Sequence, residues 1–204
     1  MHPLLQWDTD LFLAINRGWH HPAATVLFWV FSWVGRGELQ FAAVLIAALT
    51  IRITQGAAEL SRSARLLWGI TLAAVSGLLV HPFKAMWPRW RPAHDLQSLG
   101  MWLAPDEPLS GRNSFPSGHA WSGGACFVVL ALWLWPRNRP AAVACLFCAF
   151  GVALSRVYRG VHYPLDVTVG LLLGACCGWL CWRYIVKGGA PCAADTPSSP
   201  NRTT

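Results

Sequence analysis

The sequence predicts an all-α, polytopic membrane protein in which six transmembrane helices form a bundle behind an amphipathic N-terminal helix. Of its 204 residues, 54% are hydrophobic and only 12% are charged, which is too few to cover a soluble globule of this size. The apolar residues gather in six runs that approach the length needed to cross a bilayer. The 13 tryptophans are typical of helix ends at a membrane interface.

The N-terminal segment, residues 4–19, is expected to be an amphipathic helix on the membrane surface. Leucine, isoleucine and tryptophan recur there every three or four residues. Asp8, Asp10 and Arg17 interrupt any apolar core of a signal peptide, so no cleavage is expected. The first apolar run would then act as an uncleaved anchor.

The apolar runs cover residues 22–35, 39–53, 66–83, 118–135, 140–155 and 165–186. With six spans, the basic connections at 52–65 and 136–139 share one side with both termini. The positive-inside rule makes that side cytoplasmic. We therefore expect a single domain over residues 1–187 with both termini in the cytoplasm. Residues 188–204 are rich in Gly, Pro, Ser and Thr, and we expect a disordered cytoplasmic tail there.

Polar residues gather in three clusters, all on the predicted outer side. They are Lys84 with Arg91-Pro92, then the run 116–119 (Pro-Ser-Gly-His), then Ser155-Arg156 followed by His162 and Asp166. Cations in or beside hydrocarbon are costly, so those that a membrane chain contains usually serve its function. Because all three clusters lie on one side, we expect them to form one site.

The basic residues of these clusters suit a phosphate group. Arg91 and Arg156 offer planar forks that bind two phosphate oxygens at once, and Lys84 adds a point charge. Ser117 and Gly118 open an apolar helix, where unpaired backbone N–H groups and the helix dipole favour an anion. Such donors would stabilise the equatorial oxygens of a phosphoryl transition state.

The two histidines can divide the covalent work. His162 and Asp166 are four residues apart, and Pro164 is well placed to begin the helix that carries Asp166. The carboxylate could fix the tautomer of His162 and leave its other nitrogen free to attack phosphorus. His119 could protonate the leaving oxygen and later activate water.

Other binding classes fit less well. The net charge of +7 comes without a basic stripe, so we expect anionic lipids and a phosphate-bearing substrate rather than nucleic acid. His162 and Asp166 could ligate zinc or magnesium, but Asp166 is the only carboxylate in the clusters and the cations would repel a metal. No cofactor is expected. Arg89, Arg159 and Tyr158 lie between motif positions, and we interpret them as interfacial residues.

The longest outer connection, residues 92–116, contains an apolar Met101-Trp102-Leu103 segment flanked by glycine and proline. Two alternatives stay open for it. It could dip into the membrane surface as a lid, or serve as a plain interfacial anchor.

In order and spacing, the three clusters resemble the signature of the type 2 phosphatidic acid phosphatases, over about residues 66–186. The resemblance implies a six-helix phosphatase of a bacterial inner (cytoplasmic) membrane whose site faces the periplasm or exterior, with a phosphohistidine on His162. Asp166 would orient that histidine and His119 would serve as acid and base. The implied phosphate-binding residues are Lys84, Arg91, Ser117, Gly118, His119 and Arg156.

The substrate stays open at this point. A compact chain resembles bacterial members that act on lipid phosphates, of which undecaprenyl diphosphate is favoured. Phosphatidylglycerophosphate and lipid A are alternatives. A lipid phosphotransferase would use the same intermediate but exclude water. A transporter is a further alternative, although no cluster lies in the middle of a span. No obligate protein partner is evident.

Overall fold

The computed structural model describes residues 3–107 and 111–188, which are helical with irregular connections and contain no strand. The helices are α1 (Pro3–Gly18), α2 (Pro22–Val34), α3 (Gly37–Thr54), α4 (Ala57–Ser76), η1 (Gly77–Leu79), α5 (Val80–Met86), α6 (Pro92–Asp95), η2 (Gln97–Leu99), α7 (Gly118–Leu134), α8 (Arg139–Tyr158), α9 (Pro164–Cys181) and η3 (Trp182–Val186). Five of the six apolar runs are thus helical within a few residues of the predicted bounds. The run predicted at 66–83 is longer, because α4 already begins at Ala57 and η1 and α5 continue it to Met86.

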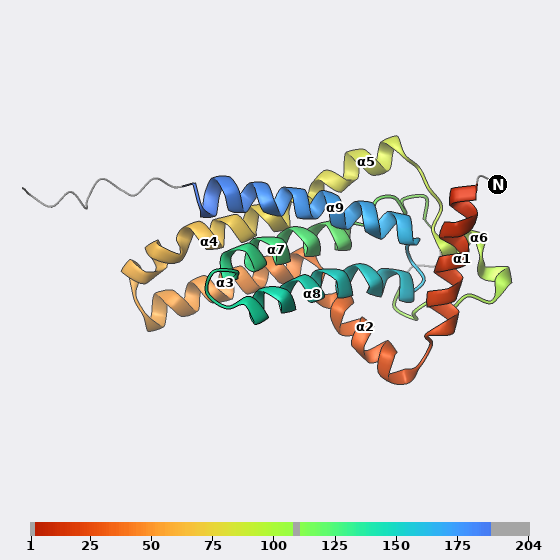
Figure 1. Cartoon of the computed structure of the whole chain (residues 1–204), viewed down its shortest axis with the longest axis horizontal. Coiled ribbons are helices and arrows are strands. Elements are labelled where there is room, and N and C mark those ends of the chain that lie inside the picture. Colours follow the sequence, from red (N-terminus) through yellow and green to blue (C-terminus); the bar gives the residue numbers. More distant parts are fainter. Residues whose placement is uncertain (1–2, 108–110, 189–204) are drawn as a thin grey trace, which may run out of the picture.

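Helix α7 lies in the middle of an elongated bundle, packed against α4, α8 and α9 (Figure 1). Its contact with α9 depends on glycines four residues apart. A methyl group added to Gly174 would lie 2.1 Å from the carbonyl oxygen of Trp121, and Gly170 and Gly178 meet α7 backbone in the same way. Small residues at this spacing let two membrane helices approach closely. The seam therefore fixes α9 against α7.

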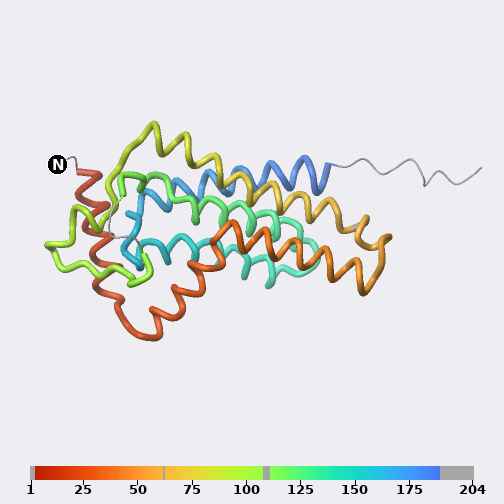
Figure 2. The backbone as a smooth tube through the Cα atoms, turned by 180° about the vertical axis from the view of Figure 1, so that it is seen from behind, coloured from red at the N-terminus to blue at the C-terminus, as the bar shows by residue number. Residues whose placement is uncertain are grey.

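Helices α2 and α3 do not form two antiparallel crossings. Both views show α3 continuing in the direction of α2, so that together they pass once from one end of the bundle to the other (Figures 1 and 2). Only Gly35 and Arg36 separate them, and Arg36 has an extended backbone (φ −77°, ψ 125°). At 13 residues α2 is shorter than a full span, which needs about 20 residues. The structure therefore does not support six full crossings.

The two ends of the described chain lie at opposite ends of the bundle. Helix α1 crosses the end at which α9 begins, and its Asp8 accepts a hydrogen bond from the Leu165 N–H (2.8 Å). By contrast, η3 lies at the far end, where Trp182 and Lys187 share a cavity with Arg137. The expectation that both termini share one side is thus wrong for the described residues, because α2 and α3 contribute only one pass. Apart from Gly188, the predicted tail lies outside the described residues.

Several helices are long and apolar enough to cross a membrane: Gly37–Thr54, Ser63–Met86, Arg139–Tyr158 and Pro164–Val186, four in the described part of the chain. Pro22–Val34 and Gly118–Leu134 are apolar but shorter. Large hydrophobic side chains are exposed on the outer faces of these helices, including Ile46, Ile53, Trp68 and Phe147. Exposed apolar surface of this extent suits contact with lipid. The chain is a membrane protein by these criteria.

Candidate active site

The fold brings the three polar clusters to one end of the bundle. The segment after α5, the start of α7 and the connection from α8 to α9 all lie at the end that α1 crosses (Figure 1). His119 is close enough to interact electrostatically with His162, Arg156 and Lys84, which come from different clusters. The predicted site residues therefore meet in space.

Three cations face this region. The Nζ atom of Lys84 donates to the Asn113 carbonyl (2.8 Å), which holds the lysine beside Arg91 and Arg156. The Nε atoms of Arg91 and Arg156 are buried and have no hydrogen-bond partner among the described residues. A buried guanidinium N–H without a partner is costly unless a ligand fills that role. These two donors indicate an anion-binding site.

The start of α7 is more constrained than the sequence indicates. Ser117 caps the helix, because its hydroxyl accepts from the Ala120 N–H (3.4 Å). Its own N–H donates to the carbonyl of Asp166 (3.0 Å) and is therefore not available to a ligand. The N–H groups of Gly118 and His119 follow in the first turn, where helix geometry leaves such donors unpaired. The backbone donors of this turn that could face an anion are therefore those of Gly118 and His119, whereas Ser117 has only its hydroxyl proton to offer.

Asp166 is fully buried in the first turn of α9, which begins at Pro164 as predicted. Its Oδ2 accepts from the Ser114 hydroxyl (2.5 Å) and from the Tyr163 N–H (2.9 Å). The Nδ1 atom of His162 lies 3.5 Å from the same oxygen. With Nδ1 turned toward the carboxylate, Nε2 is the nitrogen of His162 that is free for chemistry.

His162 is buried, with 2% of its surface exposed. Burial lowers the pKa of the imidazole to about 4; Asp166 opposes this shift, whereas Arg156 and Arg91 add to it. His162 is therefore neutral near pH 7 and retains the lone pair that a nucleophile needs. His119 lies on the first turn of α7 and is partly exposed. Two imidazoles, of which that of His162 is neutral, thus flank the cations.

Acidic residues from the 92–116 connection also reach the site, which the sequence analysis missed. Glu107 accepts hydrogen bonds from both terminal nitrogens of Arg156 (2.8 and 3.1 Å) and from Nε of Arg159 (2.9 Å). Asp106 pairs with Arg159 (2.5 Å). Burial alone would raise the pKa of Glu107, but the two guanidinium groups outweigh it and hold that pKa below its usual value. Asp166 is the only carboxylate in the three sequence clusters, but the fold adds Glu107 and Asp106 from outside them.

Three residues interpreted as interfacial are instead buried or paired inside the protein. Arg159 is 2% exposed, and Tyr158 is fully buried with its hydroxyl 2.8 Å from that of Thr25. Arg89 forms ion pairs with Asp166 (2.7 Å) and with Asp8 (2.6 Å). The positions of these three residues in the sequence do not indicate their partners, because most of the partners, such as Asp8 and Thr25, lie in distant segments.

The Met101-Trp102-Leu103 segment is bound to the protein. The Asn16 side chain on α1 accepts from the Trp102 N–H and donates to its carbonyl, both at 2.8 Å. The Trp102 ring packs against Tyr158, with ring centroids 5.4 Å apart. The connection is thus anchored on α1 and α8 beside the site.

The described residues contain no cluster of side chains that would support the alternative of a metal site. Within residues 3–107 and 111–188, no three His, Cys, Asp or Glu side chains gather closely enough to hold an ion. Asp166 is already engaged by Arg89 and Ser114. The donors around the site instead suit a phosphate group.

Comparisons with known proteins agree with this geometry. A family model described as the PAP2 superfamily matches residues 63–189. The chain is similar to a lipid A 1-phosphatase of Rhizobium johnstonii, 45% identical over 101 residues that cover 49% of this chain and 39% of the relative. It is also similar to an undecaprenyl-diphosphatase of Sulfolobus acidocaldarius, 44% identical over 73 residues that cover 34% of this chain and 32% of the relative.

Among solved structures, the crystal structure of Aquifex aeolicus LpxE is similar to this one with a TM-score of 0.64 and 30% identity. The match covers 86% of this chain and 94% of that one. The first curated relatives are longer, and the chain spans less than half of their length (39% and 44%). Site geometry, the family match and this likeness agree: the chain belongs to the PAP2 superfamily, as the resemblance to type 2 phosphatidic acid phosphatases predicts.

Proposed function

We propose that this protein is a membrane lipid phosphatase that hydrolyses a phosphate or diphosphate monoester through a phosphohistidine on His162. The observation that carries the proposal is the convergence of the three clusters. Two buried guanidinium Nε donors, a lysine and two imidazoles meet at one end of a membrane bundle. That set can bind a phosphate, attack it and protonate its leaving group.

The chemistry follows from the geometry of each group. The Nε2 atom of His162 attacks phosphorus while the bond from phosphorus to the leaving oxygen breaks. His119, which enters this step as the imidazolium, donates its proton to that oxygen and becomes neutral. His119 then takes a proton from water as the water oxygen attacks phosphorus. The N–P bond breaks, which releases phosphate and restores both imidazoles. Arg91, Arg156 and Lys84 stabilise the charge on the equatorial oxygens in both steps.

We infer that the site end faces the periplasm or exterior. The opposite end of the bundle holds the α3–α4 and α7–α8 connections and η3, whose basic residues belong to none of the polar clusters. The positive-inside rule places such residues in the cytoplasm. They are Arg52, Arg65, Arg137, Arg139, Arg183 and Lys187. Most cations of the site end, such as Lys84, Arg91 and Arg156, instead belong to the polar clusters or lie close to them in the sequence. In this orientation α1 lies at the outer surface of an inner membrane and α9 ends inside.

For the substrate, we propose lipid A carrying a 1-phosphate as the first candidate. The support is the similarity to the Rhizobium lipid A 1-phosphatase and to Aquifex LpxE. Undecaprenyl diphosphate, favoured by the sequence alone, is the second candidate and is supported by the Sulfolobus relative. Both are phosphates on a long-chain lipid, so the same site chemistry serves either.

An apolar cavity of about 490 Å³ between α2, α3, α4 and α7 suits a lipid chain. Its lining reaches Val34, next to Gly35, where an added methyl group would lie 3.5 Å from the His119 carbonyl oxygen. The cavity therefore approaches the helix start that carries the proposed acid. A hydrocarbon chain there would bring its phosphate toward the cations.

The proposal is tested by phosphate release from detergent-purified protein with a panel of lipid A, undecaprenyl diphosphate and phosphatidylglycerophosphate. We expect release from at least one lipid, competitive inhibition by vanadate and an unchanged rate after chelation. Transfer of the phosphate to an acceptor lipid, without free phosphate, would identify a phosphotransferase. A strict need for added divalent ions would revive the metal alternative, and no release from any lipid would overturn the proposal.

A further inference from the structure

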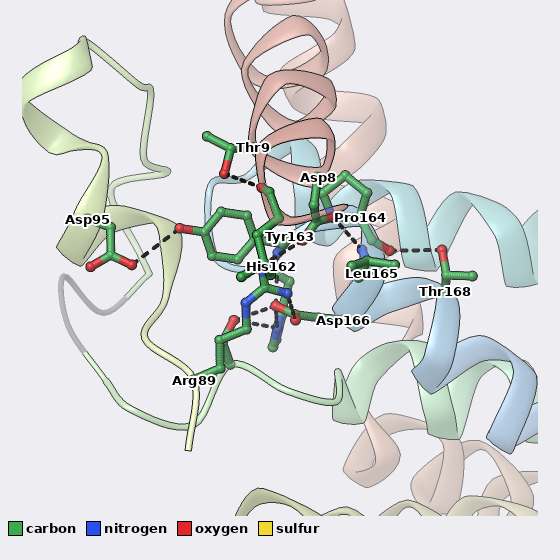
Figure 3. Close-up of polar contacts among 12 residues, drawn as sticks. Asp8, Thr9, Arg89, Asp95, His162, Tyr163, Pro164, Leu165, Asp166 and Thr168 are labelled. Carbon is green, nitrogen blue, oxygen red and sulfur yellow. Dashed lines mark hydrogen bonds and ion pairs between the residues drawn. The ribbon is translucent and has the colours of Figure 1, made fainter. Parts of the chain in front are cut away.

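Behind the proposed nucleophile lies a second carboxylate, Asp8, contributed by the N-terminal helix. Asp8 is fully buried, and its Oδ2 lies 2.6 Å from Nη2 of Arg89. The Nη1 atom of the same guanidinium lies 2.7 Å from Oδ1 of Asp166. Figure 3 shows Arg89 between the two carboxylates, with His162 beside Asp166. Asp8 is therefore linked to His162 through Arg89 and Asp166.

The charges of this network explain why a second carboxylate matters. Arg89 and Asp166 alone would form a neutral pair, leaving little net negative charge behind His162. With Asp8 included, two carboxylates flank one guanidinium and the network is net negative. A negative charge close to an imidazole stabilises its positively charged forms, and phosphohistidine formation places positive charge on that ring.

Asp8 also fixes the helix that carries Asp166. Its Oδ1 accepts from the Leu165 N–H (2.8 Å), a first-turn donor of α9 that has no partner within the helix. A carboxylate at this end also interacts favourably with the helix dipole. Both oxygens of Asp8 are thus engaged away from the phosphate-binding cations, so Asp8 does not bind the substrate.

Packing holds α1 in the place that this role requires. Phe12 packs against the Tyr163 ring with centroids 5.6 Å apart, and Asn16 bonds the carbonyls of Trp102 and Tyr158 (2.8 Å each). The Tyr163 ring lies under the Arg89 guanidinium, 4.0 Å from its central carbon. Asp8 lies outside residues 63–189, which the family model matches.

We propose that Asp8 is a positioning residue for phosphoryl transfer: acting through Arg89, it holds Asp166 in place and keeps the charge behind His162 negative. This inference rests on the proposed function and extends it to a helix beyond the signature. Helix α1 is then part of the active site rather than a membrane-surface helix alone.

The test compares Asp8→Asn with Asp10→Asn. Asp10 lies on the same helix but is exposed, so it provides a matched control. We expect Asp8→Asn to lower kcat by about 10- to 100-fold, as loss of a partner behind a functional histidine commonly does. KM should change less than about twofold because Asp8 does not touch the phosphate. Asp10→Asn should resemble the wild type.

A double variant separates positioning from simple loss of structure. Arg89→Gln leaves two buried carboxylates without their cation, which is strongly destabilising. Adding Asp8→Asn to it removes one of them and restores the single negative charge at Asp166. We expect the double variant to be more active than Arg89→Gln alone. Independent, multiplicative effects of the two substitutions would contradict a link through Arg89.

A second readout does not depend on turnover. In protein labelled with isotopes at histidine, the NMR titration of His162 is identified by its loss in His162→Asn. We expect its pKa to fall in Asp8→Asn, because a negative charge has gone, and to stay unchanged in Asp10→Asn. If Asp8→Asn matches Asp10→Asn in both kinetics and titration, the inference is overturned. If the wild type hydrolyses no lipid phosphate, the proposed function fails while the titration still decides the role of Asp8.

Discussion

Glu107 and Arg156 form a two-pronged ion pair, with carboxylate oxygens 2.8 and 3.1 Å from the two terminal nitrogens of the guanidinium. Ser32 accepts a further hydrogen bond from Arg156 Nη1. Both terminal nitrogens of Arg156, Nη1 and Nη2, thus have partners, while Nε is buried without a partner among the described residues. Glu107 therefore fixes the direction in which Arg156 presents its free donor.

Glu107→Ala is expected to destabilise the protein by about 3–5 kcal/mol, because two buried guanidinium groups would lose their shared partner. Asp106→Asn is the matched control: the Asp106 side chain is 46% exposed, and an exposed ion pair contributes about 0–1 kcal/mol. Thermal denaturation in detergent compares the two. Equal shifts of the midpoint would show that Glu107 is not the main partner of these arginines.

The covalent mechanism predicts different outcomes for the two histidines. His162→Asn should abolish both turnover and labelling of the protein by radioactive substrate phosphate, since no nucleophile remains. His119→Asn should lower turnover by about 10²- to 10⁴-fold, because proton transfer to the leaving oxygen and from water is lost. Labelled protein from rapid quenching reports the intermediate. Stable labelling of the His162 variant would contradict the assignment of the nucleophile.

The free energy of unfolding should decrease as the pH is lowered from about 6.5 to about 4, because of His162. Burial lowers the pKa of His162 to about 4, whereas a histidine in an unfolded chain titrates near 6.5. Between these values the unfolded chain binds a proton that the native protein does not, so unfolding becomes more favourable as pH falls. The difference corresponds to about 3 kcal/mol.

The thermal midpoint measured from pH 6.5 down to 4 checks this expectation. His162→Asn, which cannot titrate, should show a shallower decline than the wild type. Parallel curves for the two proteins would mean that His162 titrates alike in the folded and unfolded states.

The contact between α7 and α9 should not tolerate a methyl group. Gly174→Ala places a carbon 2.1 Å from the Trp121 carbonyl oxygen, so the helices must move apart. We expect a loss of about 1–3 kcal/mol, as in other overpacked cores. Gly18→Ala, with no atom within 4 Å of the added carbon, is the control. Similar melting of both variants would show that the two helices separate easily.

Hydropathy and motif order predicted the helices and the convergence of the clusters. The run at 118–135 is α7 (Gly118–Leu134), and Pro164 begins α9, because apolar length and proline act locally. The site residues gather as expected, since each lies in or next to the terminal turn of a helix at the same end of the bundle. They are Lys84, Arg91, His119, Arg156, His162 and Asp166.

The remaining features depend on long-range partners that hydropathy does not describe. Nothing in the sequence around Asp8 or Glu107 shows that each meets a guanidinium 81 or 49 residues away. The direction of α3 after α2 depends on the two-residue Gly35-Arg36 junction. Hydropathy locates the two apolar runs but does not indicate whether the second helix turns back or continues in the direction of the first. The signal in the sequence is an aspartate among the regularly spaced apolar residues of 4–19. Such a charge is seldom buried without a partner, so Asp8 could have prompted a search for a cation.

The glycine seam has a consequence for how the protein meets membranes of different thickness. Because backbone contacts fix the register between α7 and α9, the spacing of the His119 and His162 imidazoles is set by protein packing. Helix α3 packs mainly on α4 and presents Leu45, Ile46, Leu49 and Ile53 to its surroundings. The pair of helices α3 and α4 can then tilt to match a thinner or thicker bilayer, at a modest free-energy cost per ångström of mismatch. In the proposed mechanism, the distance between the two imidazoles then stays the same in bilayers of different thickness.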